Sequence, residues 1–197
     1  MYSSLDNLGL SVVGGRASGV GVGGLTLGGG ISYLSPRYGW TCDTVLGFEL
    51  VVANGSIVEA KPGENEELLI ALRGGANNFG IITRIDLETF DQGLFWLATL
   101  YHPASTIDNL VQEFISVASA DRYDEYASLI TTFGYSANQS QTIIANNLIY
   151  SKVNEARDTP DVFRGILNLP TLVHTENVTN MATLSHIAGS LQADGSR

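Results

Sequence analysis

A glycine-rich segment near the N-terminus constrains this chain more than any other feature. Ten glycines lie among the 26 residues from Gly14 to Gly39, which read GGRASGVGVGGLTLGGGISYLSPRYG. Glycine at this density weakens helices and strands, so a folded protein keeps it where the backbone approaches another surface closely or adopts a positive φ. The flanking segments are apolar, unlike those of a flexible linker. A bound ligand is therefore the first candidate for that surface.

The composition is that of a folded protein and excludes several classes. With 44% hydrophobic and 15% charged residues among 197, the chain suits one large or two small globular domains. A net charge of -10 without a cluster of Lys or Arg opposes nucleic-acid binding. We expect no membrane span, because no run of about 18 apolar residues occurs. The N-terminus lacks the pattern of a signal peptide, and the compartment stays open.

Few residues point to catalysis or to a metal. Cys42 is the only cysteine, which excludes an internal disulfide and a Cys-based zinc site. The histidines show no i, i+4 or H-x-H spacing, so no metal site is predicted: His102, His174 and His186. Neither a G-x-S-x-G elbow nor a Walker A sequence occurs. Three N-x-S/T sequons would be acceptors only in a secretory pathway: Asn54, Asn138 and Asn177.

The segment after the glycines predicts a small sheet with one helix. Two β-rich runs over 45–61 flank Asn54-Gly55, a dipeptide that favours a type I′ hairpin turn. Residues 64–75 begin with acidic side chains, carry leucines at helical spacing and end in two glycines, which indicates a short helix. Residues 79–90 predict a strand that rejoins the sheet of the hairpin.

Glycine nearly vanishes after residues 91–93, which indicates a domain boundary. The elements expected beyond it are a strand over 94–102, an amphipathic helix over 105–120, an antiparallel pair over 125–136 and 141–151, and mostly helical segments over 154–169 and 178–191. Four tyrosines on these elements could face a ligand, although core or surface placement is the alternative: Tyr123, Tyr126, Tyr135 and Tyr150.

Residues 19–24 formally satisfy G-x-G-x-x-G, the dinucleotide fingerprint. A nicotinamide site of this type requires a helix from about Gly24, whose N-terminal amides hold the pyrophosphate. We expect no stable helix over 25–39, because that stretch holds three consecutive glycines and a proline. Two interpretations remain: a non-helical glycine loop whose amides cradle a cofactor, and a structural turn without a ligand.

Residues 21–60 and 71–90 resemble the FAD-binding domain of the berberine-bridge-enzyme-like oxidoreductases, in the vanillyl-alcohol oxidase and PCMH superfamily, and above all its fungal members. The motifs V-G-V-G-G, L-G-G-G, Y-G and N-F-G-I-x-T at these distances carry the resemblance. It implies an α+β fold. Residues 1–92 would form part of a PCMH-type FAD-binding domain, with a mixed or antiparallel sheet and helices, and residues 93–197 the first part of an α+β substrate-binding domain.

The resemblance also implies FAD as cofactor and assigns its contacts to two groups of residues. The glycine motifs place Val20, Gly21, Val22, Gly23, Gly24, Gly28, Gly29, Gly30, Tyr38 and Gly39 against the flavin and its diphosphate. The second motif adds Asn78, Phe79, Gly80 and Ile82. For Tyr38 and Phe79, ordinary core packing is an equally good interpretation. Arg73 is better explained as a cation at a helix C-terminus than as a catalytic group.

The chain departs from the family pattern at three points. The flavin-linking histidine of an R-S-G-G-H type motif would precede the first residue, and most active-site side chains would follow the last. Ala17 stands where members with a second covalent flavin bond carry a cysteine, so no cysteinyl bond is expected and Cys42 is displaced from that position. The catalytic base stays unknown.

The activity implied is FAD-dependent oxidation of a small organic substrate, with dioxygen as electron acceptor, in fungal secondary-metabolite biosynthesis. The alternative is a truncated, non-catalytic fragment of such an enzyme. No nucleic-acid or membrane partner is expected.

Overall fold

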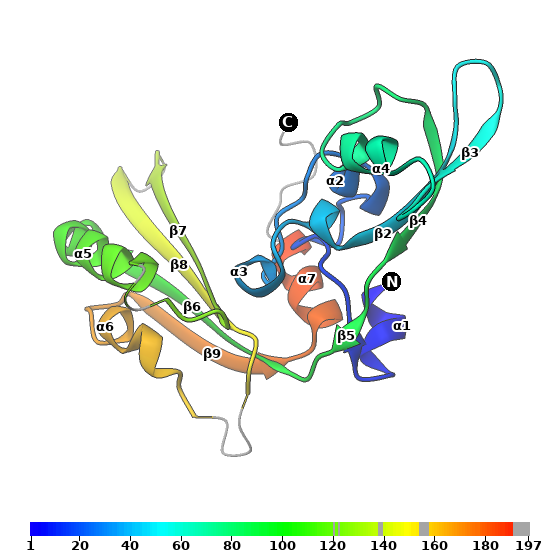
Figure 1. The fold of residues 1–197 in the computed structure, drawn as a ribbon. Helices are drawn as coiled ribbons and strands as arrows, with labels where there is room; N and C mark the ends of the chain where they lie inside the picture. Colours follow the sequence, from blue (N-terminus) through cyan, green and yellow to red (C-terminus); the bar gives the residue numbers. More distant parts are fainter. Residues whose placement is uncertain (120, 122, 138–139, 154–157, 191–197) are drawn as a thin grey trace. The chain divides into compact units, whose positions relative to one another are not determined.

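The chain divides into two compact units, each described here by itself (Figure 1). The first unit comprises residues 1–92 together with the C-terminal segment from Met181, and the second comprises residues 93–180. The segment from Met181 thus groups with the first unit, whereas the sequence predicted it as part of the second domain, and the identity of the two domains stays a prediction. The residues that the computed structural model describes are 1–119, 121, 123–137, 140–153 and 158–190. Within these ranges no helix is both long and apolar enough to cross a membrane.

The first unit combines short helices with antiparallel strands. Its elements are α1 (Tyr2–Asp6), β1 (Leu10–Ser11), α2 (Val22–Leu27), α3 (Ser35–Tyr38), β2 (Val45–Val51), β3 (Ile57–Ala60), α4 (Glu66–Leu72), β4 (Ile81–Leu87), β5 (Phe90–Asp91) and α7 (Met181–Ser190). The main sheet has the order β3-β2-β4, and β1 pairs with β5. The sequence predicted that the strand after α4 rejoins the sheet of the hairpin, and the β2–β4 pairing confirms this prediction.

The hairpin turn between β2 and β3 differs from the predicted type I′ turn. Gly55 has a φ of 85°, but Asn54 does not share the positive φ that this turn requires at both central positions. Instead, the Asn54 Oδ1 accepts a 2.9 Å hydrogen bond from the Ser56 amide, and the Gly55 amide donates to the Val52 carbonyl at 2.9 Å. The local side-chain bond fixes Asn54 in a conformation outside the left-handed region.

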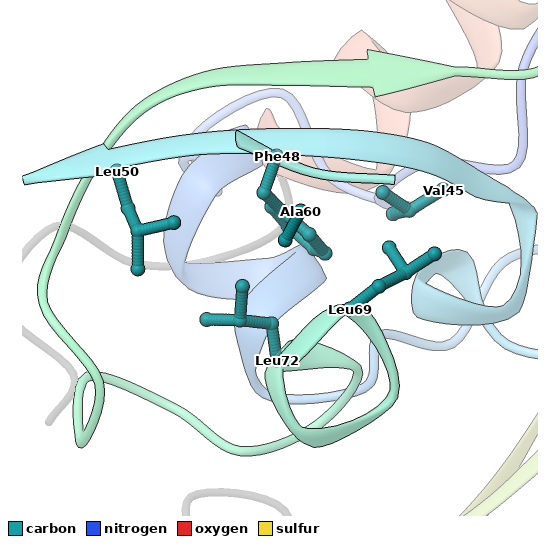
Figure 2. Packing of buried hydrophobic residues seen from close by; sticks show 6 residues of the cluster. All are labelled: Val45, Phe48, Leu50, Ala60, Leu69 and Leu72. Atoms are coloured by element: carbon teal, nitrogen blue, oxygen red, sulfur yellow. The ribbon is translucent and has the colours of Figure 1, made fainter. Parts of the chain in front are cut away.

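The core of the first unit lies between the sheet and α4 (Figure 2). Leu69 and Leu72 project from one side of α4 toward Phe48 and Leu50 on β2, and all four side chains are buried. The acidic residues of the first turn suit the positive end of the helix dipole. Gly74 follows the helix with a φ of 86°, a conformation that ends helices well.

The second unit is one antiparallel sheet with helices on one face. Its elements are β6 (Phe95–Pro103), α5 (Ile107–Ala118), β7 (Ala127–Ser136), β8 (Gln141–Tyr150), α6 (Arg164–Leu167) and β9 (Val173–Thr179). The sheet order is β7-β8-β6-β9, and α5 and α6 lie on the same face (Figure 1). On that face Trp96, Leu100 and Leu148 pack with Phe163 and Ile166.

The sequence did not predict β9, and its omission has a physical reason. This strand lies at the edge of the sheet, and its residues from Val173 to Asn177 are exposed. Without a buried face the strand shows no apolar alternation, which is the main sequence pattern of a strand. Residues 154–157, part of the expected helical tail, lie outside the described ranges.

Helix α7 is held against α1 and the glycine-rich segment by two hydrogen bonds in its first half and by a close approach near its end. Near its start, the Ala182 amide donates to the Asp6 Oδ2 at 2.9 Å. One turn farther along, the Ser185 carbonyl accepts a 3.0 Å hydrogen bond from the amide of Ser18, the first residue of the exposed part of the glycine-rich segment. A Cβ on Gly189 would collide with the Ser18 hydroxyl, so glycine at 189 permits this close approach.

Two neighbouring positions of α4 provide a test of the core. Leu72→Ala should lower the free energy of unfolding by about 2–5 kcal/mol, because Leu72 is fully buried against the sheet. Ile70→Ala is the matched control, since Ile70 is 63% exposed, and we expect a change within about 0.5 kcal/mol. Urea unfolding followed by circular dichroism measures both. Equal losses in the two variants would contradict this packing.

Tyr150 makes the stability of the second unit depend on alkaline pH. Burial, followed by its hydrogen bond to the Asp124 carboxylate at 2.9 Å, raises the pKa of the Tyr150 phenol to about 12. A raised pKa favours the neutral phenol, so the stabilisation is present below pH ~10 and lost as the pH rises toward the folded-state pKa.

Between pH ~10 and ~12, Tyr150→Phe should therefore lose less thermal stability than the wild type. Tyr135→Phe, which alters a 69% exposed phenol on the same sheet, is the control and should follow the wild-type profile. Thermal midpoints of the three proteins measured across this pH range test the prediction. A Tyr150→Phe profile parallel to the wild type would refute the assignment.

Candidate functional site

The glycine-rich segment contains helices, contrary to the sequence prediction. Helix α2 covers Val22–Leu27, and the short α3 covers Ser35–Tyr38. The physical reason is tertiary packing, which can outweigh low helix propensity. Thr26 is fully buried and its hydroxyl donates to the Val22 carbonyl at 2.8 Å, while Leu27 packs against the core beneath the sheet. The three consecutive glycines begin only where α2 ends.

The presence of α2 does not make this a nicotinamide-binding fold. That fold needs a parallel sheet in which the first strand leads into the nucleotide-binding helix. Here β1 pairs antiparallel with β5, and every strand pair in the described part of the chain is antiparallel. A helix near Gly24 is therefore not sufficient to identify the nicotinamide fold.

The glycines of the segment fall into two physically different groups. Residues 18–24 are all exposed. A Cβ added to any glycine of this first group would meet no protein atom within 4 Å: Gly19, Gly21, Gly23 and Gly24. Their backbone is thus open to a ligand, as the cofactor interpretation requires.

The second group is packed against the protein itself. A Cβ on Gly29 would lie 3.1 Å from the Trp40 ring, and one on Gly30 would lie 2.8 Å from the Thr41 Cβ. Both glycines have positive φ angles, of 98° and 81°. Gly28 follows directly on α2, where its added Cβ would press on the Gly24 carbonyl. These three glycines satisfy requirements of the fold, and a contact with FAD stays a prediction for them.

Two cavities flank α2. The first, here called the α7 cavity, has a volume of about 500 Å³ and lies among α1, residues 15–20, α2 and α7. The second, the β4 cavity, has a volume of about 610 Å³ and lies between α2 and residues 77–85. Val22 lines both. The predicted site residues that line at least one of them are Val20, Val22, Gly23, Gly24, Gly80 and Ile82.

The β4 cavity brings together two predicted groups that are far apart in sequence. Gly23 and Gly24 face Gly80 and Ile82 across it. Gly80 has a φ of 152°, and a Cβ there would collide with the Val51 carbonyl of β2, so this glycine lets β4 begin close beside β2. Its neighbours have local roles: the side-chain Nδ2 of Asn78 donates to the Gly75 carbonyl at 2.7 Å, and the Phe79 ring lies over Gly75.

The remaining predicted positions lie outside both cavities. The Tyr38 ring stacks on Phe90 with centroids 4.0 Å apart, and the Arg37 guanidinium lies over the Tyr38 ring. This is the packing alternative expected for Tyr38. Gly39, with a φ of 81°, accommodates the Asp43 carboxylate, which accepts a hydrogen bond from the Trp40 amide at 2.7 Å.

Ala17 and Cys42 lie in different surroundings. Ala17 lines the α7 cavity, whereas Cys42 is buried beside Gly29, whose carbonyl accepts the Cys42 amide at 2.9 Å. Burial, followed by the neighbouring Asp43 charge, raises the pKa of the Cys42 thiol and keeps it protonated. Arg73 donates to the Val45 carbonyl at 2.7 Å, which is a structural role.

Sequence reasoning missed the contribution of α7. Thr183, Ser185 and His186 line the α7 cavity together with Tyr2 from α1. Burial raises the pKa of the Tyr2 phenol, which donates to the Gly15 carbonyl at 3.0 Å. No local motif links residues so distant in sequence. Within the described residues, no cluster of His, Cys, Asp or Glu is suited to hold a metal ion.

Known proteins share sequence with this chain over most of its length. Residues 2–61 match the family described as FAD binding domain. The protein named FAD-dependent monooxygenase CTB5, from Cercospora beticola, is 42% identical over 167 residues, covering 85% of this chain and 32% of that protein. The chain belongs to the FAD-binding flavoproteins. FAD is the cofactor of this family, and the resemblance based on the glycine motifs is confirmed.

Two further comparisons give a solved structure with a similar fold and a relative that is named as a peptidase. The crystal structure of 6-hydroxy-D-nicotine oxidase from Arthrobacter nicotinovorans has a TM-score of 0.85 and 21% identity, over 98% of this chain and 42% of that chain. The predicted α+β fold is thereby confirmed. The protein named Oligopeptidase PhomG', from Diaporthe leptostromiformis, is 45% identical over 176 residues, which cover 89% of this flavoprotein chain and only 14% of that protein.

The chain covers only a small part of the length of these relatives. It spans less than a third of the length of either curated relative, with shares of 32% and 14%. The peptidase name thus describes a protein of which the match covers a small part, and this chain carries no G-x-S-x-G elbow.

A single added methyl group should have opposite effects on the free energy of unfolding in the two groups of glycines. Gly24→Ala should leave the unfolding free energy unchanged or raise it by up to about 1 kcal/mol, because the methyl meets no protein atom and alanine favours the helix. Gly30→Ala should lower it by more than about 1 kcal/mol, through the collision with Thr41 and the positive φ. Urea unfolding of the two variants measures the contrast, which would be absent if both glycines were equally packed.

Proposed function

We propose that this chain forms part of an FAD-dependent oxidoreductase that oxidises a small organic substrate, with dioxygen as electron acceptor. The observation that carries the proposal is the open backbone of Gly19, Gly21, Gly23 and Gly24, in a chain that belongs to the FAD-binding flavoproteins. The name of the Cercospora relative, an FAD-dependent monooxygenase, supports an oxygen-dependent reaction. A role in fungal secondary-metabolite biosynthesis is part of the same proposal and rests on the family resemblance.

The residues present fit the cofactor by shape. Side-chain-free backbone at Gly23 and Gly24 leaves a surface on which a flat or extended ligand can lie without a steric conflict. Val22 lines both cavities, so a long ligand with a ring system at each end could reach from one to the other by passing over Val22. We assign Val20, Gly21 and Val22 to the same surface.

In the proposed redox reaction, the cofactor and the protein residues have separate roles. When bound, FAD supplies the electron chemistry by taking up two electrons from the substrate. The protein residues position the cofactor and exclude water: Val20 and Val22 provide apolar contact on one side of α2, and Ile82 does so across the β4 cavity. The four-stranded sheet of the second unit is the proposed start of the substrate-binding domain.

Reconstitution with FAD tests the proposal directly. The purified 197-residue chain should bind FAD and show flavin absorbance after removal of excess cofactor. The double variant Gly23→Ala/Gly24→Ala should bind at least about 10-fold more weakly, which corresponds to about 1.4 kcal/mol, because two methyl groups enter the space of the ligand. Its thermal stability should be unchanged or higher.

Gly93→Ala is the matched control, because a Cβ there also meets no protein atom and Gly93 lines neither cavity. It should bind FAD as the wild type does. Isothermal titration calorimetry gives the affinities. A well-folded, colourless chain without measurable FAD binding would overturn the proposal and support the alternative of a non-catalytic fragment.

A further inference from the structure

Helix α7 holds a fixed position beside the exposed glycines. Its two anchors are the hydrogen bond from the Ala182 amide to Asp6 and the hydrogen bond from the Ser18 amide to the Ser185 carbonyl, at 2.9 and 3.0 Å. Farther along the helix, Gly189 also approaches the Ser18 hydroxyl closely. Because these contacts extend from Ala182 to Gly189, the side chains between them, including His186, are held in place relative to the glycine-rich segment. This positioning is built from residues more than 160 positions apart.

The α7 cavity that results has two chemically different walls. The glycine-rich segment contributes Val20, Val22 and Leu25, which are apolar. Helix α7 contributes Thr183 and His186, which are polar and exposed. An apolar wall opposite a few placed polar groups is typical of sites that bind a flat ring with a hydrogen-bonding edge. The heteroaromatic rings of FAD, isoalloxazine and adenine, both have this chemistry.

His186 differs from the other two histidines, both of which the structure describes. His102 is fully buried, and its Nδ1 lies 2.8 Å from the Pro170 carbonyl. His174 pairs with Glu176 at 2.8 Å on the exposed edge strand β9. Only His186 lines one of the two cavities at α2. Its imidazole can donate one hydrogen bond and accept another in the neutral form.

We propose that His186 is an FAD-binding residue that hydrogen-bonds to the edge of one of the two heteroaromatic rings. This assignment rests on the proposed function, since it requires the chain to bind FAD. It adds to the glycine surface a polar contact from the opposite wall of the α7 cavity, supplied by a helix outside the segment that matches the FAD binding domain family.

Binding measurements on the 197-residue chain test His186 without any need for turnover. His186→Ala should weaken FAD binding about 10-fold, the effect of losing a hydrogen bond worth about 1.4 kcal/mol. His186→Gln keeps a donor and an acceptor and should recover affinity to within about threefold of the wild type. Because His186 is exposed, neither change should shift the thermal midpoint.

His174→Ala removes a histidine outside the cavity, and Ser190→Ala alters the exposed end of the same helix; both are controls and should bind FAD normally. FMN and ADP then distinguish the rings. If His186→Ala weakens FMN but not ADP, the imidazole contacts isoalloxazine, and the reverse result assigns it to adenine. Quenching of flavin fluorescence on binding provides a second readout for FAD and FMN.

The outcomes separate this assignment from the proposed function. If the wild-type chain binds FAD and His186→Ala binds it equally well, the role of His186 is refuted while the proposed function stands. If the folded wild-type chain binds none of the three probes, the proposed function fails and the assignment fails with it. A loss in His186→Ala that glutamine does not restore would show that the effect is not a hydrogen bond.

Discussion

The contact of Gly29 and Gly30 with residues 40–42 holds the glycine-rich segment in place. The Thr41 amide donates to the Gly30 carbonyl and the Cys42 amide to the Gly29 carbonyl, both at 2.9 Å. Trp40 and Thr41 fill the space where side chains at these glycines would lie. These contacts therefore fix the backbone at the end of α2. A fixed backbone loses less entropy when a ligand binds, so packing of one group of glycines preorganises the exposed group.

Each wall of the two cavities is also tied to a core or to an anchored helix. Leu27 connects α2 to the core that α4 and the sheet enclose, and Ile82 is both part of that packing and a wall of the β4 cavity. On the other side, α7 is anchored at Asp6 and Ser18. The geometry of the site thus depends on contacts made elsewhere in the first unit, as expected where binding loops rest on a rigid scaffold.

The sequence predicted those elements whose local pattern agrees with their tertiary surroundings. Helix α4 has an acidic start, buried leucines at helical spacing and a glycine end, and each feature is used in the structure. Strand β8 alternates buried and partly buried residues over most of its length because one face packs on helices. Helix α2 could not be predicted, since Thr26 and Leu27 stabilise it through burial rather than propensity. The edge strand β9 lacks a buried face and shows no pattern.

The candidate site was likewise predicted only in those parts that have a local sequence pattern. The exposed glycines and the motif around Gly80 were found because missing side chains are visible in a sequence. Their partition into open and packed groups was not, because it depends on where Trp40 and Thr41 lie. The contribution of α7 is set by long-range contacts to Asp6 and Ser18, which leave no local pattern.

Charge explains why such a site would rely on backbone. FAD carries an anionic diphosphate, yet this chain has a net charge of -10. Arg84 lines the β4 cavity, but it is engaged by Glu49, Glu59 and Asp86. Hydrogen bonds from Lys61 and Arg84 lower the pKa of Glu59, which keeps this carboxylate ionised and the arginine charge compensated. Among the residues that line the two cavities, the proposed recognition at α2 therefore rests on shape and hydrogen bonding. The proposed glycine surface with His186 on another wall would provide both, and discrimination by steric fit is largely insensitive to ionic strength.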